Sequence, residues 1–166
     1  MSATGSLDFE QILLALLRHG VRFIVVGGVC GALHGSPVVT LDLDVVHARD
    51  TANIDRLLSA LEELDAVYRI QPERKLRPSA EALMGKGHHL LITRHGPMDI
   101  LGMIGHDHGY DELLPHTVEM HLDNERQIDT LDLRTLIRVK EETAGAKDAA
   151  ALAALRQILA ESEDTN

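Results

Sequence analysis

Hydrophobic residues recur along the chain with two spacings, one typical of helices and the other of strands. Over Phe9–His19 they fall every three or four residues, which predicts an amphipathic helix that Gly20 ends. The β-branched run Val21–Val26 has the length of a buried strand. Apolar residues alternate with aspartates over Leu41–Val46, which predicts a second strand, and the spacing over Thr51–Leu64 predicts a second long helix.

The remaining elements are shorter and are separated by turn residues. A short helix is expected at Val29–His34, after the break at Gly27-Gly28, and a hairpin turn at His95-Gly96-Pro97. The pattern also predicts strands at Ala66–Ile70, His89–Arg94, Met98–Ile104, Val118–Leu122 and Arg126–Ile128, a loop or short helix at 71–87, a loop with one helical turn at Gly105–Pro115, and helices at Leu131–Thr143 and Lys147–Glu161.

This order of elements predicts an α+β (mixed α/β) fold, in which helices flank a mixed sheet and a helix pair ends the chain. We expect one domain over residues 1–166, because chains of this length usually form one. Residues 1–7 are expected to be a tail, and residues 130–161 a C-terminal helical part.

Composition and charge exclude several classes of protein. The net charge of −10 argues against a broad nucleic-acid-binding surface, which needs basic stripes. A single cysteine, Cys30, excludes a disulfide scaffold. No apolar run approaches the roughly 20 residues of a membrane span, and Met1–Glu10 lacks a basic signal-peptide region. We therefore expect a cytoplasmic protein with no membrane partner. The acid excess serves either solubility or a site that gathers carboxylates.

Asp42 and Asp44 are the strongest candidates for chemistry. Because side chains alternate along a strand, these two carboxylates point the same way, while Leu41, Leu43 and Val45 face the core. Neighbouring carboxylates repel each other unless a cation or a proton lies between them. Magnesium, which prefers oxygen ligands, fits that need. The alternative is an ordinary strand face exposed to solvent.

Two further features favour a functional site over an ordinary exposed strand face. Gly27-Gly28 ends the preceding strand, where glycines let the backbone approach a phosphate group. Asp99 lies in a later, otherwise apolar strand, where a lone acid is uncommon unless it is paired or bound to a ligand. The alternatives are a tight turn for the glycines and an edge-strand charge for Asp99.

These motifs resemble the nucleotidyltransferase superfamily, and most closely its minimal bacterial branch related to abortive-infection and type IV toxins. The residues that carry the resemblance are Phe23 to Gly28, His34-Gly35-Ser36, Thr40 to Val45, Asp99, Leu136 to Lys140, and Gly145 to Asp148. The resemblance covers about residues 21–155. It implies that two Mg²⁺ ions, or Mn²⁺ in their place, are held by the catalytic carboxylates Asp42, Asp44 and Asp99.

The same resemblance implies how a nucleoside triphosphate binds. Its phosphates would contact Gly27, Gly28, Ser36, Lys140 and Lys147, with Asp148 orienting Lys140. From the residues alone, Ser36 also reads as a turn serine, the lysines as ordinary helix-end charges, and Asp148 as a helix cap.

Other groups carry weaker signals. Arg74, Lys75 and Arg77 could touch a phosphate or an RNA acceptor, or could form a solvated loop. The His106-Asp107-His108 motif invites a metal interpretation, but lacks a further ligand at a recognised spacing, so a structural role is favoured. Cys30 is expected to fill the core.

The resemblance implies an enzyme that moves a nucleoside monophosphate from a triphosphate to a hydroxyl group of an RNA, a protein or a small molecule. A toxin that acts on tRNA or protein, with a cognate antitoxin partner, is the role implied by the branch. The alternative is a degenerate relative that binds nucleotide or a partner protein without turnover.

Overall fold

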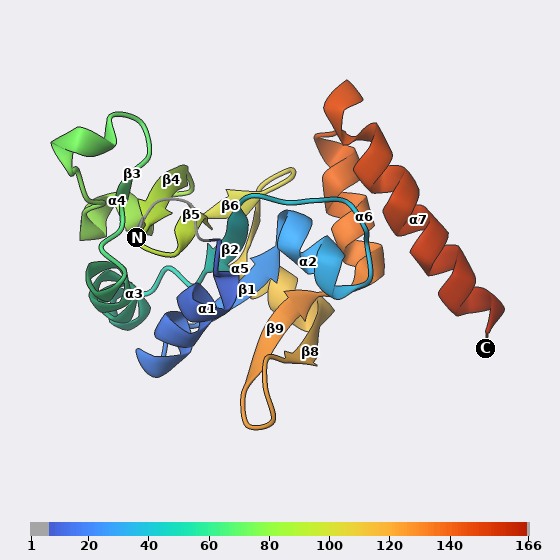
Figure 1. The fold of residues 1–166 in the computed structure, drawn as a ribbon, viewed down its shortest axis with the longest axis horizontal. Helices are drawn as coiled ribbons and strands as arrows, with labels where there is room; N and C mark the ends of the chain where they lie inside the picture. Colours follow the sequence, from blue (N-terminus) through green and yellow to red (C-terminus); the bar gives the residue numbers. More distant parts are fainter. Residues whose placement is uncertain (1–6, 166) are drawn as a thin grey trace.

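The structure is a computed structural model that describes residues 7–165. Within these residues, seven strands form one mixed sheet (Figure 1). Strand β2 runs parallel to β5 and β1 runs parallel to β9, whereas the other neighbouring pairs are antiparallel. The strands lie in the order β3 (Val67–Tyr68), β4 (His88–Thr93), β5 (Gly96–Leu101), β2 (Leu43–His47), β1 (Phe23–Val26), β9 (Gln127–Leu131) and β8 (Thr117–His121).

Helices surround this sheet, and a separate pair of short strands, β6 (Met103–Ile104) and β7 (His108–Gly109), follows β5. The α+β class and the mixed sheet with flanking helices are therefore confirmed. The helices are α1 (Phe9–Arg18), α2 (Gly27–Leu33), α3 (Thr51–Glu63), α4 (Ala80–Met84), α5 (Tyr110–Leu113), α6 (Leu133–Glu142) and α7 (Ala149–Asp164), with 3₁₀ turns η1 (Pro72–Arg74), η2 (Leu114–His116) and η3 (Ala146–Asp148).

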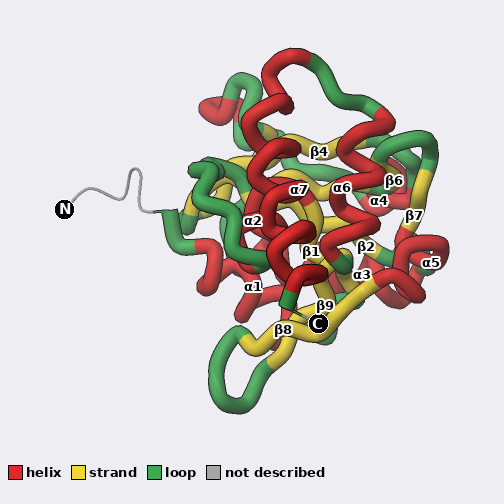
Figure 2. Tube along the Cα trace, turned by 90° about the vertical axis from the view of Figure 1, so that its right-hand side faces the viewer, coloured by secondary structure: helices red, strands yellow, loops and turns green. Residues whose placement is uncertain are grey.

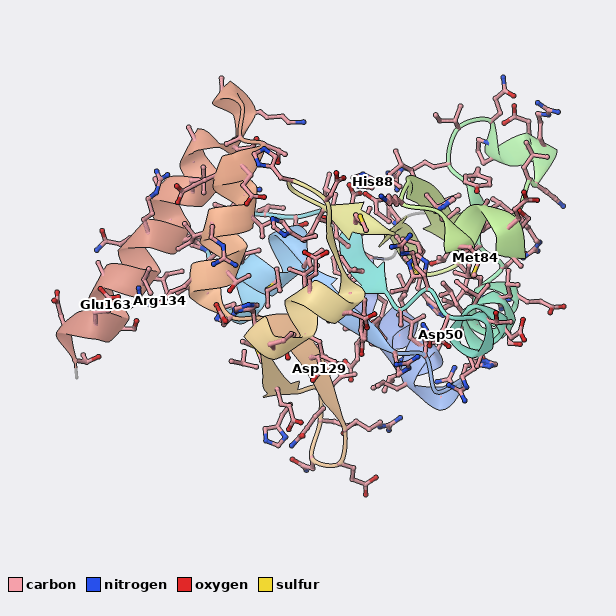
Figure 3. All side chains as sticks on the ribbon, turned by 180° about the vertical axis from the view of Figure 1, so that it is seen from behind. Asp50, Met84, His88, Asp129, Arg134 and Glu163 are labelled. Carbon is pink, nitrogen blue, oxygen red and sulfur yellow. The ribbon has the colours of Figure 1, made fainter. Side chains whose placement is uncertain are left out.

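The predicted C-terminal helix pair is present as α6 and α7, which lie side by side (Figures 1 and 2). Asp132 caps α6 by accepting a hydrogen bond from the Thr135 N–H at 2.7 Å. An ion pair between Arg134 and Glu163 joins the two helices (Figure 3). None of the described helices is long and apolar enough to cross a membrane.

The alternation predicted for β2 holds only in part, because Val46, on the same side as Asp44, is fully buried as well. Leu43 and Val45 are fully buried, and so is His47, whose Nε2 lies 2.8 Å from the Leu83 carbonyl oxygen of α4. The prediction that Leu41 also faces the core is wrong, because its side chain is 62% exposed. The strand begins only at Leu43, so the alternation does not extend back to Leu41.

A second difference concerns the expected strand Met98–Ile104, which is interrupted at Gly102. The Gly102 N–H donates to the Gly87 carbonyl at 2.9 Å, and a Cβ on Gly102 would lie 2.4 Å from the Gly85 oxygen. This close backbone approach ends β5 and starts β6. It is a contact between distant segments, which strand periodicity does not report.

Asn53 links the first turn of α3 to the residues that precede β1 and follow β2. It is fully buried, accepts from the Arg22 N–H at 2.7 Å, and donates to the carbonyl oxygens of Arg22 and Ala48 at 3.1 and 2.7 Å.

We expect Asn53→Ala to lower the free energy of unfolding by about 3 kcal/mol, because buried backbone groups lose their partners. Urea titration of this variant beside Asp55→Ala, an exposed change in the same helix, measures the loss. Equal effects would contradict the prediction.

Candidate active site

Two carboxylates, Asp44 and Asp99, lie next to each other because β2 and β5 are parallel neighbours in register. Asp44 pairs with Asp99 on one side and with Val26 of β1 on the other. Directly paired residues share a sheet face and have close Cβ atoms. The next residue after Val26 is Gly27, so the glycine turn also lies beside Asp44. Sheet register therefore joins motifs that are far apart in the sequence.

Asp44 is held in an environment that disfavours its charge. Burial, followed by the negative charges of Asp99 and Asp42, raises the pKa of Asp44 from 3.8 to about 7, and Lys140 acts in the opposite direction. Its Oδ1 atom is buried and has no hydrogen-bond partner among the described residues. A buried oxygen of this kind costs free energy unless a ligand or a proton satisfies it.

Gly27 and Gly28 allow the chain to pass close to these side chains. Gly27 has a φ of +65°, and a Cβ there would lie 2.1 Å from the Asp44 Oδ2 atom. A Cβ on Gly28 would lie 2.5 Å from the Thr40 Oγ1 atom. Both positions therefore exclude a side chain, which keeps the surface beside Asp44 open to a ligand.

Arg69, which the sequence analysis did not single out, is part of this site. Its Nη2 donates to Asp99 Oδ1 at 2.9 Å and its Nη1 donates to the Leu91 carbonyl at 3.0 Å. The arginine directly follows β3, and its N–H bonds to the Leu90 oxygen, while Leu90 pairs with Asp99. Arg69 thus reaches across one strand to neutralise a carboxylate. The one sequence signal was an arginine inside the expected strand Ala66–Ile70.

Lys140 and Asp148 lie together where α6 and α7 meet. The Lys140 Nζ atom is 3.5 Å from Asp148 Oδ1, and Asp148 Oδ2 accepts from the Gly145 N–H at 2.9 Å. The side chain of Asp148 makes no capping bond to α7, but through Gly145 it caps η3, the turn that leads into α7. Its role in orienting Lys140 stays a prediction. Lys147 is exposed on η3, and its contact with phosphate stays a prediction.

Two cavities adjoin Gly27 and Lys140. The smaller, about 170 Å³, is lined by Gly28, Ser36 and Thr40 as well. Ser36 Oγ also accepts from the Val38 N–H at 3.3 Å, so this serine belongs to the turn and faces the cavity. The larger, about 320 Å³, reaches Asp44.

The donor set of this site fits a hard divalent cation, although it is not a complete metal cage. Over residues 7–165, no group of three or more His, Cys, Asp or Glu side chains is arranged to hold a metal ion. Asp42 acts on Asp44 through its charge and is only partly buried. Mg²⁺ usually binds one or two protein carboxylates and takes its other ligands from water and substrate phosphates. The Asp44–Asp99 pair and the unpartnered Asp44 oxygen match that arrangement.

The residues with weaker signals in the sequence either make contacts within the fold or lie at the surface. His108 lies 2.8 Å from Glu142 through its Nε2, and Arg77 pairs with Asp65 at 2.5 Å. Cys30 is fully buried, and burial raises the pKa of its thiol to about 12, so it fills the core as expected. Arg74 and Lys75 are exposed on and beside η1.

Comparison with known proteins gives a structural match only. No family model and no curated protein matches the chain. The lincosamide antibiotic adenylyltransferase LnuA, solved with lincomycin bound, aligns with a TM-score of 0.60 and 14% identity, over 93% of this chain and 99% of that chain. A Thermotoga maritima protein proposed to be a nucleotidyltransferase aligns with a TM-score of 0.56 and 17% identity, over 92% and 91%. The chain therefore has the nucleotidyltransferase fold.

Proposed function

We propose that this protein is a metal-dependent nucleotidyltransferase, which moves a nucleoside monophosphate from a nucleoside triphosphate to a hydroxyl group. The observation that carries the proposal is the partly buried Asp44–Asp99 pair, in which one Asp44 oxygen is buried without a partner among the described residues and Gly27 lies against the other. Repelling carboxylates are retained where a cation or a reaction needs them. The similar structures, an adenylyltransferase and a protein proposed to be a nucleotidyltransferase, support the same class of chemistry.

The carboxylates Asp42, Asp44 and Asp99 would hold Mg²⁺, or Mn²⁺ in its place. When bound, the two ions supply charge neutralisation for the triphosphate and activation of the acceptor hydroxyl. The protein's own residues provide the rest. Asp99 accepts the proton of the acceptor hydroxyl, while Arg69 holds its other oxygen in place.

The phosphate groups would lie against Gly27, Gly28 and Ser36. Lys140, aligned by Asp148, contributes a point charge to the phosphates. The bond between the α-phosphorus and the bridging oxygen breaks, the acceptor oxygen bonds to that phosphorus, and pyrophosphate leaves. Lys147 would extend the phosphate contacts from η3.

The acceptor is a small molecule, an RNA such as tRNA, or a protein side chain. A small-molecule hydroxyl is supported by the adenylyltransferase whose structure is similar. Basic side chains would contact an RNA acceptor only locally, near residues 74–86, since the net charge of the chain is −10. A toxin function with an antitoxin partner rests on the sequence resemblance.

Incubation with each of the four α-labelled nucleoside triphosphates tests the proposal. With Mg²⁺ or Mn²⁺ and a panel of tRNA, protein and small-molecule hydroxyl acceptors, we expect label transfer with equimolar release of pyrophosphate. Chelation by EDTA should abolish both signals, because the carboxylates then lack a cation. No transfer, together with no nucleotide binding by calorimetry, would rule the enzyme out. Binding without transfer would favour the alternative of a non-catalytic nucleotide-binding protein.

A further inference from the structure

The larger cavity beside Asp44 is mainly apolar. It has a volume of about 320 Å³ and lies between the sheet, the β6–β7 strand pair and α6. Volumes near 300 Å³ are at the lower end for sites that bind small organic molecules. Its apolar walls come from Val26, Leu101, Ile104, Leu131, Leu136 and Val139.

The residues expected to meet phosphate lie mostly in the other, smaller cavity. Gly28, Ser36 and Thr40 line only that cavity, whereas Gly27 and Lys140 line both. The two spaces therefore lie on either side of Gly27 and Lys140. The smaller cavity also has apolar walls, from Val38, Val39, Leu136, Ala151 and Leu155, but it holds the backbone of Gly28 and the hydroxyl groups of Ser36 and Thr40. If the triphosphate occupies this smaller cavity, the larger one is left for a different chemical group.

The lining of the larger cavity does not suit a nucleobase. Bases are usually held by stacking on aromatic rings and by hydrogen bonds to their edges. The cavity wall has no Phe, Tyr or Trp among the described residues. Its histidine, His88 (Figure 3), lies with Nε2 2.8 Å from the Met103 carbonyl oxygen. Lys140 is paired with Asp148.

One wall of the cavity is held in place by Glu142 of α6. Its Oε1 accepts from the His106 N–H at 2.8 Å and lies 2.8 Å from His108 Nε2. Gly105, with φ of +56°, passes so close that a Cβ would lie 2.4 Å from this oxygen. The segment that follows β6 is thus fastened to α6, and the cavity is preformed.

We propose that this cavity binds the acceptor, and that the acceptor is a small, largely apolar molecule whose hydroxyl group faces the Asp44–Asp99 pair. The inference rests on the proposed function and narrows it. Apolar walls stabilise an apolar ligand by removing its surface from water. Asp44 is the one carboxylate in the lining, and Asp99 lies beside it. The acceptor's reactive group would therefore meet the carboxylates at the polar end of the cavity.

The test uses benzyl alcohol as the probe and the whole chain with methyl-labelled leucine, isoleucine and valine. We expect saturable NMR shifts of the Leu101, Ile104 and Val139 methyl groups. Ile104→Trp, which fills the cavity, should weaken probe binding at least about tenfold, the equivalent of about 1.4 kcal/mol. Met103→Trp is the matched control, since Met103 neighbours Ile104 on β6 but lines a different cavity.

Thr143→Trp, at an exposed position on the cavity wall, repeats the test without changing a packed residue. Calorimetry with Mg²⁺-ATP separates the two proposals. Wild-type protein that binds Mg²⁺-ATP but not benzyl alcohol overturns this inference alone, as does displacement of the probe by adenosine or equal weakening in Met103→Trp. Wild-type protein that binds none of the four nucleoside triphosphates with Mg²⁺ overturns the proposed function. Retained Mg²⁺-ATP binding in both cavity-filling variants, with probe binding lost, supports the inference.

Discussion

Asp44→Asn is expected to abolish metal-dependent nucleotidyl transfer and, at the same time, to stabilise the fold. The amide keeps the shape of the side chain but removes the charge that a cation needs. Loss of a metal ligand should cost several kcal/mol of transition-state stabilisation, on the order of 10³-fold in rate or more. The gain in stability arises because the carboxylate is buried beside Asp99 in the absence of a ligand.

The pH dependence of this gain has a definite sign. The pKa of Asp44 is about 7 in the folded chain and 3.8 in an ordinary environment, so the folded state binds the extra proton between these values. The contribution of Asp44 to wild-type stability therefore falls as pH rises from about 4 to 7, by up to about 1.4 kcal/mol per unit of pKa. The advantage of Asp44→Asn should be absent below pH 4 and full above pH 7.

Urea unfolding of the two proteins from pH 4 to pH 8, beside label transfer, measures both effects. Asp129→Asn is the matched control: Asp129 lies on β9, and its pKa is also raised, chiefly by burial, but it does not line either cavity near Asp44. That variant should keep its transfer activity. Activity retained in Asp44→Asn, or a stability difference that does not change with pH, would contradict the assignment of Asp44.

Gly27→Ala is expected to disrupt the same site through the backbone. A φ of +65° is unfavourable for alanine, and residues held in such a conformation cost about 1–3 kcal/mol. The new Cβ would also lie 2.1 Å from Asp44 Oδ2, so the carboxylate has to move. We expect Mg²⁺-ATP binding, measured by calorimetry, to weaken at least about tenfold, because positioned ligands are lost.

Gly20→Ala separates backbone strain from damage to the site. Gly20 has a similar φ of +70°, but a Cβ there would meet only the Arg56 side chain, at 3.7 Å. The control should lose stability and keep Mg²⁺-ATP binding.

A double variant, Gly27→Ala with Asp44→Ala, should lose less stability than the sum of the two single changes, since the clash between the new Cβ and the carboxylate disappears. Unchanged nucleotide binding in Gly27→Ala would refute the close approach as a functional feature.

The fold does not determine which acceptor the protein uses, because one fold serves many reactions. At 14% and 17% identity, the similar structures share the arrangement of the sheet and helices with this chain. The lining of the apolar cavity and the Glu142 contact belong to this chain's own residues. Acceptor specificity is therefore to be tested at Ile104 and Thr143.

The sequence by itself determined the features that depend on near neighbours along the chain. A period of two residues puts Asp44 on one side of β2 and buries Leu43 and Val45 on the other, although the strand begins only after Asp42. The α+β class and the C-terminal helix pair follow from the same periodicities. The glycine turn was also visible, since only glycine takes a positive φ without strain.

Only the tertiary structure decided which distant segments meet. The parallel register of β2 and β5 brings Asp99 beside Asp44, and the edge strand brings Arg69 to Asp99 across Leu90. The break at Gly102 and the contacts of Glu142 with the segment after β6 likewise come from residues that are remote in the sequence. Local spacing carries no information on strand register or helix docking, because those depend on how the whole core packs.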